Sequence, residues 1–254
     1  MSRQVRDMFA SIAGRYDLTN DVLSFGVHRL WRRKLVRLGA FNRGSTVLDL
    51  CTGTGDLAFC ISRAIGESGH VLGLDFVGPM LELAKQKYPA RSESGSAPIS
   101  FFQGDAMKLP LADSSVDAAT VAFGIRNVDN VHECLLEIRR VLKPCGKLLV
   151  LEFGQVQVPL FRTVYDWYSA HVMPLLGMLL TGNRAAYEYL PKTALAFPSG
   201  EKFLAGMNRA GYSATRAVAL MGGIAYIYSG ESTATASLSP QSSTDPVSNF
   251  SAYC

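Results

Sequence analysis

From residue 46 onward, short apolar segments alternate with amphipathic segments along the chain. Residues 46–50 form an apolar run with β-branched side chains, which is typical of a buried strand. The same pattern predicts strands at 70–75, 99–103, 116–123 and 147–153, helices at 56–65, 79–87 and 131–142, and a loop at 89–98. Strands that alternate with helices predict an α/β fold, in which helices cover both faces of a parallel sheet.

The alternation stops after residue 153. Residues 159–181 are rich in aliphatic and aromatic side chains, but their longest apolar run is too short to span a bilayer. A helix at 200–210 and two strands, at 215–220 and 224–228, are predicted next. Residues 231–254 are rich in Ser, Thr and Pro, so we expect a disordered, low-complexity tail there.

The amino-terminal segment differs from the rest in pattern and in charge. Residues 1–45 are predicted to be helical, because Trp31, Leu35 and Leu38 recur at helical spacing. Residues 1–46 hold nine Lys and Arg against three Asp, although the whole chain carries a net charge of only +4. Such a basic segment is compatible with an anionic membrane, a nucleic acid or a solvated surface.

Composition excludes several classes of protein. The 254 residues are 48% hydrophobic and 18% charged, which excludes a disordered chain and indicates one domain, with or without a lid. The five cysteines form no CxxC pair, so neither a metal site nor a disulfide framework is expected. The first residues are polar and charged, so we expect no signal peptide and a cytoplasmic location.

A glycine-rich turn between the first predicted strand and helix is the main candidate for a cofactor site. Gly53, Gly55 and Ala58 fit the dinucleotide fingerprint GxGxxG/A, in which small residues let the backbone approach a ligand. Asp75 closes the second strand, where a carboxylate can bind ribose hydroxyls. This pattern fits an NAD-dependent oxidoreductase and an S-adenosylmethionine enzyme almost equally.

Three further acids favour S-adenosylmethionine. Asp49 lies inside the first strand and Asp56 in the first helical turn, where pyrophosphate would meet like charge. Asp105 follows the third strand, where it can accept a hydrogen bond from an adenine amino group. S-adenosylmethionine carries a sulfonium and an ammonium, whereas NAD carries two phosphates.

Several segments are more specific than the glycine turn. They are Tyr16-Asp17-Leu18-Thr19-Asn20-Asp21, Leu23-Ser24-Phe25-Gly26, His28-Arg29-Leu30-Trp31-Arg32, Phe123-Gly124-Ile125-Arg126-Asn127-Val128, Arg140-Val141-Leu142-Lys143-Pro144 and Leu149-Val150-Leu151-Glu152-Phe153. In these motifs the chain resembles the ubiquinone/menaquinone biosynthesis C-methyltransferase family, over about residues 5–230.

The resemblance implies a fold and an activity. The fold would be that of a class I S-adenosylmethionine-dependent methyltransferase, with a Rossmann-like seven-stranded sheet and a reversed final strand. Residues 1–45 would form a helical lid, and residues 46–230 the catalytic domain, with a helical insert at about 155–210. The reaction would be C-methylation of a polyprenylated quinol ring, with demethylmenaquinol as the first choice of acceptor. The ubiquinone-pathway 2-methoxy-6-polyprenyl-1,4-benzoquinol and demethylphylloquinol remain alternatives.

The resemblance also assigns residues to the S-adenosylmethionine site. Together with the glycine turn, the expected cofactor-binding residues are Asp49, Thr52, Gly53, Thr54, Gly55, Asp75, Asp105 and Ala106. Asp75 would bind the ribose, and Asp105 with Ala106 the adenine. The family often has glycine where this chain has Thr52, which would narrow the methionine end of the site.

Methylation at carbon needs an electron-rich ring, and the hydroquinone supplies it best when one oxygen is ionised. A phenol has a pKa near about 10, so a guanidinium beside it would favour the phenolate. Arg126 is our candidate for this electrostatic role, and Asn127 for a hydrogen bond to a ring oxygen. His28 is an alternative base from the lid.

The remaining expectations concern substrate and partners. The expected substrate-binding residues are Tyr16, Asn20, Phe25, Phe123, Tyr165 and Tyr168, and Trp167 with the apolar run 172–180 would extend the path for the isoprenoid tail. A lipid substrate implies peripheral membrane contact, on an organelle if the source is eukaryotic. No nucleic-acid partner is expected, because the aromatic residues are not interleaved with the basic cluster. A homodimer is left open.

Overall fold

The computed structural model describes residues 3–233, apart from the side chains of residues 160 and 161. The seven strands are β1 (Thr46–Leu50), β2 (His70–Asp75), β3 (Ile99–Gln103), β4 (Val116–Ala122), β5 (Leu142–Phe153), β6 (Tyr212–Leu220) and β7 (Ala225–Ser232). The α-helices are α1 (Arg3–Ile12), α2 (Tyr16–Ser24), α3 (Val27–Gly39), α4 (Asp56–Ile65), α5 (Gly78–Arg91), α6 (Val131–Val141), α7 (Pro159–Trp167), α8 (Met173–Thr181), α9 (Arg184–Ala196) and α10 (Glu201–Arg209).

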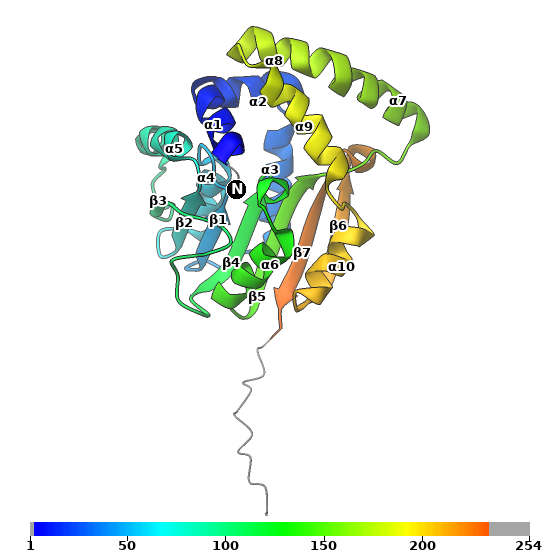
Figure 1. Ribbon diagram of the computed structural model, residues 1–254. Helices are drawn as coiled ribbons and strands as arrows, with labels where there is room; N and C mark the ends of the chain where they lie inside the picture. Colours follow the sequence, from blue (N-terminus) through cyan, green and yellow to red (C-terminus); the bar gives the residue numbers. More distant parts are fainter. Residues whose placement is uncertain (1–2, 234–254) are drawn as a thin grey trace, which may run out of the picture.

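The strands form one sheet in the order β3-β2-β1-β4-β5-β7-β6 (Figure 1). Neighbouring strands are parallel from β3 to β5, whereas β7 runs antiparallel to both β5 and β6. Helices α3 to α5 cover one face of the sheet, and α6 with α10 cover the other. The predicted α/β fold with a reversed final strand is confirmed.

Apolar side chains fill the space between the sheet and each helical layer. On one face, Trp31 and Leu35 of α3 pack with Ile61 of α4 against β1 and β5. On the other face, Ile138 of α6 and Met207 of α10 pack against the opposite side of the same strands. Both faces of the central strands are therefore buried, which explains why they are almost entirely apolar in sequence.

The predicted ends of several elements were wrong. Strand β5 begins at Leu142 instead of residue 147, because Leu142 already pairs with Val116 of β4. Strand β6 begins at Tyr212 instead of residue 215, because it pairs with the far end of β7. Strand β7 continues to Ser232, so residues 231 and 232 belong to the sheet and not to the tail. The strand extends this far because Glu231 pairs with Lys147 of β5. The disorder predicted for the rest of the tail falls on residues outside the described range.

Helix α5 also runs further than predicted, to Arg91, into the segment expected to be a loop. Pro89 lies in its last turn, where the lost N–H removes only one helical hydrogen bond. A proline in the last turn of a helix therefore does not mark the end of that helix, contrary to the prediction from the sequence.

The amino-terminal helices and the segment from α7 to α9 meet above the carboxyl edge of the parallel strands (Figure 1). An apolar cluster joins them, with Ile12 and Leu23 on one side and Met173 and Tyr187 on the other. The Tyr168 hydroxyl also donates to the carbonyl oxygen of Leu23, at 2.9 Å. Helices α1 to α3 therefore form a lid that packs on the insert as well as on the sheet.

Within residues 3–233, no helix has both the length and the apolar character needed to cross a bilayer.

The Gly55 turn gives a test of the fold. Gly55 has φ +84°, and a Cβ there would lie 3.1 Å from Phe59 and 3.2 Å from Ala84. We expect Gly55→Ala to lower the free energy of unfolding by about 1–3 kcal/mol, from backbone strain and crowding together. Denaturant unfolding measures the change.

Gly95→Ala is the matched control. Gly95 has a similar φ of +82°, but a Cβ there would contact nothing within 4 Å. Gly95→Ala should therefore lower the free energy of unfolding through backbone strain alone, and by less than Gly55→Ala does. If both variants lost the same free energy of unfolding, crowding around Gly55 would not contribute to stability.

Candidate active site

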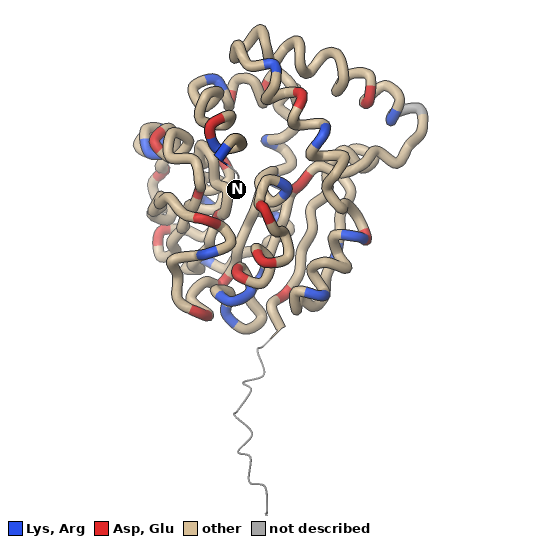
Figure 2. The backbone as a smooth tube through the Cα atoms, in the orientation of Figure 1, with Lys and Arg blue, Asp and Glu red and all other residues tan. Residues whose placement is uncertain are grey.

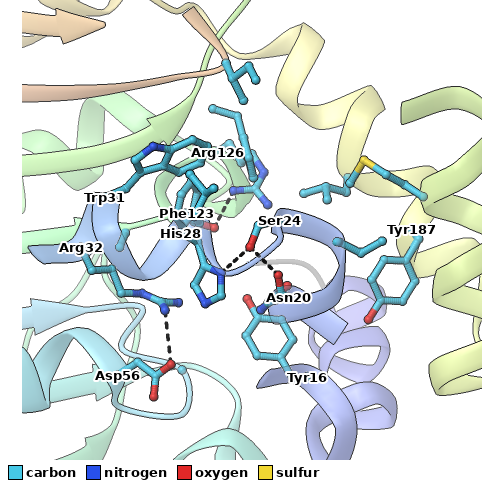
Figure 3. Close-up of a pocket in the computed structure, with 18 of the residues that line it drawn as sticks. Tyr16, Asn20, Ser24, His28, Trp31, Arg32, Asp56, Phe123, Arg126 and Tyr187 are labelled. Atoms are coloured by element: carbon cyan, nitrogen blue, oxygen red, sulfur yellow. Dashed lines mark hydrogen bonds and ion pairs between the residues drawn. The ribbon is translucent and has the colours of Figure 1, made fainter. Parts of the chain in front are cut away.

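A cavity of about 350 Å³ lies under the lid at the carboxyl edge of the sheet. Its wall combines the glycine turn after β1, the ends of β4 and β5, the lid helices and the insert (Figure 3). Most of its lining side chains are apolar or aromatic. Asp49, Asp56, Arg32, Arg126 and His28 are the ionisable groups other than tyrosine and cysteine that the described chain places in this wall.

Asp49 is buried where β1 ends. Its carboxylate accepts hydrogen bonds from the hydroxyls of Thr52 and Thr120, each at 2.6 Å. Burial raises the pKa of Asp49 to about 6, although the two threonine hydroxyls act to lower it. Thr52 therefore holds Asp49 in addition to lining the cavity. An ionised carboxylate at this position is suited to a cationic ligand group.

Asp75 fixes the glycine turn in place. One of its oxygens accepts from the backbone N–H of Gly53 at 2.8 Å, and the other accepts from that of Val77 at 2.8 Å. Burial raises the pKa of the Asp75 carboxyl, and these backbone donors oppose the shift. The end of β2 is thereby tied to the turn that follows β1.

An ionic cluster connects the lid to this turn. Lys87 of α5 donates to Asp17 of the lid at 2.8 Å and to Asp56 of α4 at 2.7 Å. The Thr54 hydroxyl donates to Asp17 at 2.6 Å, and Arg32 lies 3.3 Å from Asp56. Burial acts to raise the pKa of Asp56, but Arg32 and Lys87 lower it below its usual value. Arg32 and Lys87 balance the negative charge of Asp56. Contrary to the expectation from the sequence, this charge by itself therefore does not exclude a bound pyrophosphate.

Arg126 and Glu152 form a buried ion pair beside the cavity. The Arg126 Nη1 donates to Glu152 Oε1 at 2.7 Å and to the Phe123 carbonyl oxygen at 2.5 Å. The side chains are 5% and 0% exposed. Burial raises the pKa of Glu152, and the positive charge of Arg126 opposes that shift. The Arg126 Nε is buried and has no hydrogen-bond partner.

His28 is held on both sides by lid residues. Its Nδ1 lies 2.5 Å from the Ser24 hydroxyl, which donates to the Asn20 carbonyl oxygen (Figure 3). Its Nε2 lies 3.4 Å from Asp21. Burial, and then the charge of Arg32, lower the pKa of His28 to about 4. The imidazole is therefore neutral at neutral pH, and both of its nitrogens already face polar groups.

The structure brings most of the expected site residues into this one cavity. Its wall includes the expected residues Tyr16, Asn20, Phe25, His28, Asp49, Thr52, Gly53, Thr54, Phe123, Arg126, Tyr165 and Tyr168. The expected residues Gly55, Asp75, Asp105, Ala106 and Asn127 lie outside the wall, and so does Trp167, which faces solvent.

The residues outside the wall contact other parts of the protein. Asn127 accepts a hydrogen bond from the Tyr189 hydroxyl at 3.1 Å, which ties the insert to the Arg126 segment. Asp105 accepts from the backbone N–H of Met107 at 2.9 Å and is half-buried at the end of β3. The roles proposed for these residues stay predictions.

Sequence reasoning missed four residues that shape the site: Glu152, Lys87, Asp17 and Arg32. Glu152 carried a signal, because it is an acid inside an otherwise apolar strand. Asp17 and Arg32 stood in the quoted motifs but had no assigned function. Lys87 gave no signal, because its partners lie 70 and 31 residues away.

Residues 3–233 hold no group of three or more His, Cys, Asp or Glu side chains that could ligate a metal ion.

The sheet order with its reversed β7, and the acid-lined glycine turn after β1, define a class I S-adenosylmethionine-dependent methyltransferase. The turn fits that cofactor: a Cβ at Gly53, which lines the cavity, would contact nothing within 4 Å, and buried Asp49 faces the same space. The chain belongs to the ubiE/COQ5 methyltransferase family, whose model matches residues 1–232. This result excludes the alternative of an NAD-dependent oxidoreductase.

Named relatives agree with this family. The chain is 45% identical to the ubiquinone/menaquinone biosynthesis C-methyltransferase UbiE of Bdellovibrio bacteriovorus, over 89% of this chain and 94% of that protein. It is 37% identical to the demethylmenaquinone methyltransferase of Staphylococcus saprophyticus, over 89% and 95%. A SAM-dependent methyltransferase from Aquifex aeolicus has a similar fold, with a TM-score of 0.59 at 20% identity, over 80% of this chain and 89% of that one.

Asp49 provides a test of cofactor binding. We expect Asp49→Asn to weaken S-adenosylmethionine binding by about tenfold to a hundredfold, because a charge-assisted contact contributes about 1.5–3 kcal/mol. Wild-type affinity should fall as the pH drops through about 6, since protonation removes the negative charge of Asp49. Isothermal titration calorimetry across this range measures both effects.

In Asp49→Asn, the affinity for S-adenosylmethionine should no longer change as the pH passes through about 6. Asp113→Asn, at an exposed acid that does not line the cavity, should bind like the wild type. An Asp49→Asn protein with unchanged affinity and unchanged pH dependence would remove Asp49 from the cofactor site.

Proposed function

We propose that this methyltransferase transfers a methyl group to a ring carbon of a polyprenylated quinol, with demethylmenaquinol as the acceptor. The names of the relatives support a quinone-pathway acceptor. The observation that carries the proposal is the composition of the cavity wall. A polar group around Asp49, Thr52 and Gly53 adjoins a large apolar and aromatic lining, which suits a cationic cofactor beside a hydrophobic ring.

S-adenosylmethionine, when bound, supplies an activated methyl group on its sulfonium. Methylation would put that methyl group on a ring carbon in place of its proton, which would pass to solvent water. The ring carbon is a better nucleophile when a neighbouring hydroxyl is ionised or strongly hydrogen-bonded. The protein must therefore place a donor beside a ring oxygen.

Arg126 is positioned to be that donor. Its Nη1 is occupied by Glu152 and Phe123, but its Nε is free and its side chain lines the cavity. Because Glu152 balances the charge of the guanidinium, Arg126 acts more as a directed hydrogen-bond donor than as a free positive charge. Glu152 is a positioning residue, since it does not line the cavity and acts through Arg126.

His28 is a weaker candidate for the base. Its lowered pKa makes it a poor proton acceptor at neutral pH, and Ser24 and Asp21 already face its two nitrogens. In this scheme, alignment of the ring carbon with the methyl group lowers the activation barrier more than a proton transfer does.

The acceptor assay separates the three candidate quinols. Labelled S-adenosylmethionine is supplied with short-tailed demethylmenaquinol, 2-methoxy-6-polyprenyl-1,4-benzoquinol or demethylphylloquinol, each kept reduced. We expect methylation of demethylmenaquinol, measured as label in the extracted quinone. Transfer to the benzoquinol alone would move the enzyme to the ubiquinone pathway. No transfer to any acceptor, with cofactor binding intact, would overturn the quinol assignment.

The Arg126–Glu152 pair gives a second test. Arg126→Lys and Glu152→Gln each keep a polar side chain in the buried site, whereas removal of one charge to alanine would cost about 3–5 kcal/mol of stability. We expect kcat to fall about tenfold to a hundredfold in both variants, with little change in the KM for S-adenosylmethionine. In Arg126→Lys the alkaline rise of kcat should move to higher pH, because the acceptor hydroxyl loses the guanidinium donor that favours its ionisation.

Arg140→Lys is the matched control. Arg140 also pairs with a glutamate, Glu137, at 2.7 Å, but it does not line the cavity. Its kinetics should match those of the wild type. Loss of folding without any change in the pH profile would assign Arg126 and Glu152 a purely structural role.

A further inference from the structure

The exposed residues of the cavity wall show where the cavity opens to solvent. Of the described residues that line the cavity, three are exposed: Phe25 (83%), Val164 (58%) and Met221 (52%). They come from the α2–α3 junction, from α7 and from the turn between β6 and β7. We call these three residues the rim. All three are apolar, so the cavity opens to solvent through an apolar ring.

The helix that carries Val164 extends this apolar surface. Residues 159–181 form one continuous helix, in which a π-helical turn, Tyr168–Val172, joins α7 to α8. On it, Trp167 is 61% exposed, and Leu175 and Leu179 are exposed further along. Residues 167–183 contain no Lys, Arg, Asp or Glu, which Figure 2 shows as a long uncharged stretch. An apolar helix surface with an exposed Trp is typical of segments that lie in a membrane interface.

The surface of α3 adds positive charge beside the rim. The helix begins two residues after Phe25, and residues 22–48 contain no Asp or Glu. Arg33, Lys34 and Arg37 are exposed and have no ion-pair partner within residues 3–233. Arg33 lies six residues after Val27, the first residue of α3, which is about 9 Å along the helix and comparable to the Debye length of about 8 Å at physiological ionic strength.

We propose that the rim and Trp167 insert into the interface of an anionic lipid bilayer, while Arg33, Lys34 and Arg37 contact its headgroups. This inference rests on the proposed function, because a polyprenyl acceptor dissolved in the bilayer would then enter the cavity without crossing water. The charge of α3 favours an anionic bilayer over a second copy of this chain, since two such surfaces would repel each other. A protein that covered the rim permanently would also close the cavity.

Vesicle sedimentation tests the proposal with the full chain. The probes are vesicles of phosphatidylcholine alone and of phosphatidylcholine with phosphatidylglycerol in equal parts. We expect binding to the anionic vesicles to be at least about tenfold tighter, because each basic residue near such a surface adds about 1 kcal/mol. Added salt should weaken this preference. Equal binding to both vesicles, or none to either, would overturn the proposal.

Two variants separate the apolar part from the charged part. Trp167→Ser should weaken binding to both kinds of vesicle about tenfold, whereas the triple variant Arg33→Gln/Lys34→Gln/Arg37→Gln should abolish the preference for anionic vesicles. The matched controls are Leu136→Ser on α6 and Lys202→Gln/Arg209→Gln on α10, at residues that are exposed but do not line the cavity. Controls that weaken binding equally would show non-specific adhesion and contradict the assigned surface.

Methyl transfer to a short-tailed quinol without vesicles keeps this test apart from the proposed function. Trp167→Ser and the triple variant should retain wild-type rates there, but lose rate on a long-tailed quinol held in anionic vesicles. Failure of vesicle binding with normal transfer to the short-tailed quinol would overturn only the membrane surface. A concentration-dependent dimer that Trp167→Ser dissociates would assign the surface to a second copy instead.

Discussion

Three carboxylates are buried at the carboxyl ends of the parallel strands β1, β2 and β5, and the hydrogen-bond partners of each one shape the site. Asp49 is the last but one residue of β1 and lies beside two threonine hydroxyls. Asp75 is the last residue of β2 and lies beside two backbone N–H groups. Glu152 is the last but one residue of β5 and lies beside a guanidinium and a backbone N–H. Desolvation raises the pKa of all three. A buried acid is tolerated only when its oxygens have partners, so each carboxylate fixes the loop or side chain that partners it.

This requirement gives the three acids different functions. Asp75 has both oxygens occupied by backbone donors and thereby holds the glycine turn in shape. Asp49 is bound only by neutral hydroxyls, so its charge is left to act on the cavity it lines. Glu152 is paired with Arg126 and holds its Nη1, while the Arg126 side chain lines the cavity. Acids near the carboxyl ends of parallel strands thus hold a turn, face the cavity and fix an arginine.

The roof over these acids has the opposite character. Lid and insert meet through an apolar cluster, with Tyr168 and Leu23 at its edge. On the side of the glycine turn the lid is held by polar contacts, in which Asp17 accepts hydrogen bonds from Lys87 and Thr54. The cavity therefore has a rigid, hydrogen-bonded floor and an apolar cover, and its mouth is apolar as well. A charged cofactor beside a hydrophobic acceptor requires such a division.

The sequence by itself determined the parallel core, the glycine turn and most of the cavity wall. These features depend on local information: apolar runs that predict strands, small residues at a turn, and motifs such as Phe123–Val128 that resemble a known family. The same information placed the acids Asp49 and Asp75 at the carboxyl edge, because parallel strands all end there. It also placed the reversed last strand, although not the length of that strand.

Only the tertiary structure decided which side chains meet. Glu152 could be seen as an acid in an apolar strand, but its partner Arg126 comes from the loop after a different strand. Lys87 joins Asp17 to Asp56 across three elements, and nothing near it in sequence shows this. Strand β7 runs to Ser232 because its neighbours continue, not because of its own residues. Strand pairing, the choice of ion-pair partners and the place of the cavity mouth depend on contacts between distant segments, which local patterns do not contain.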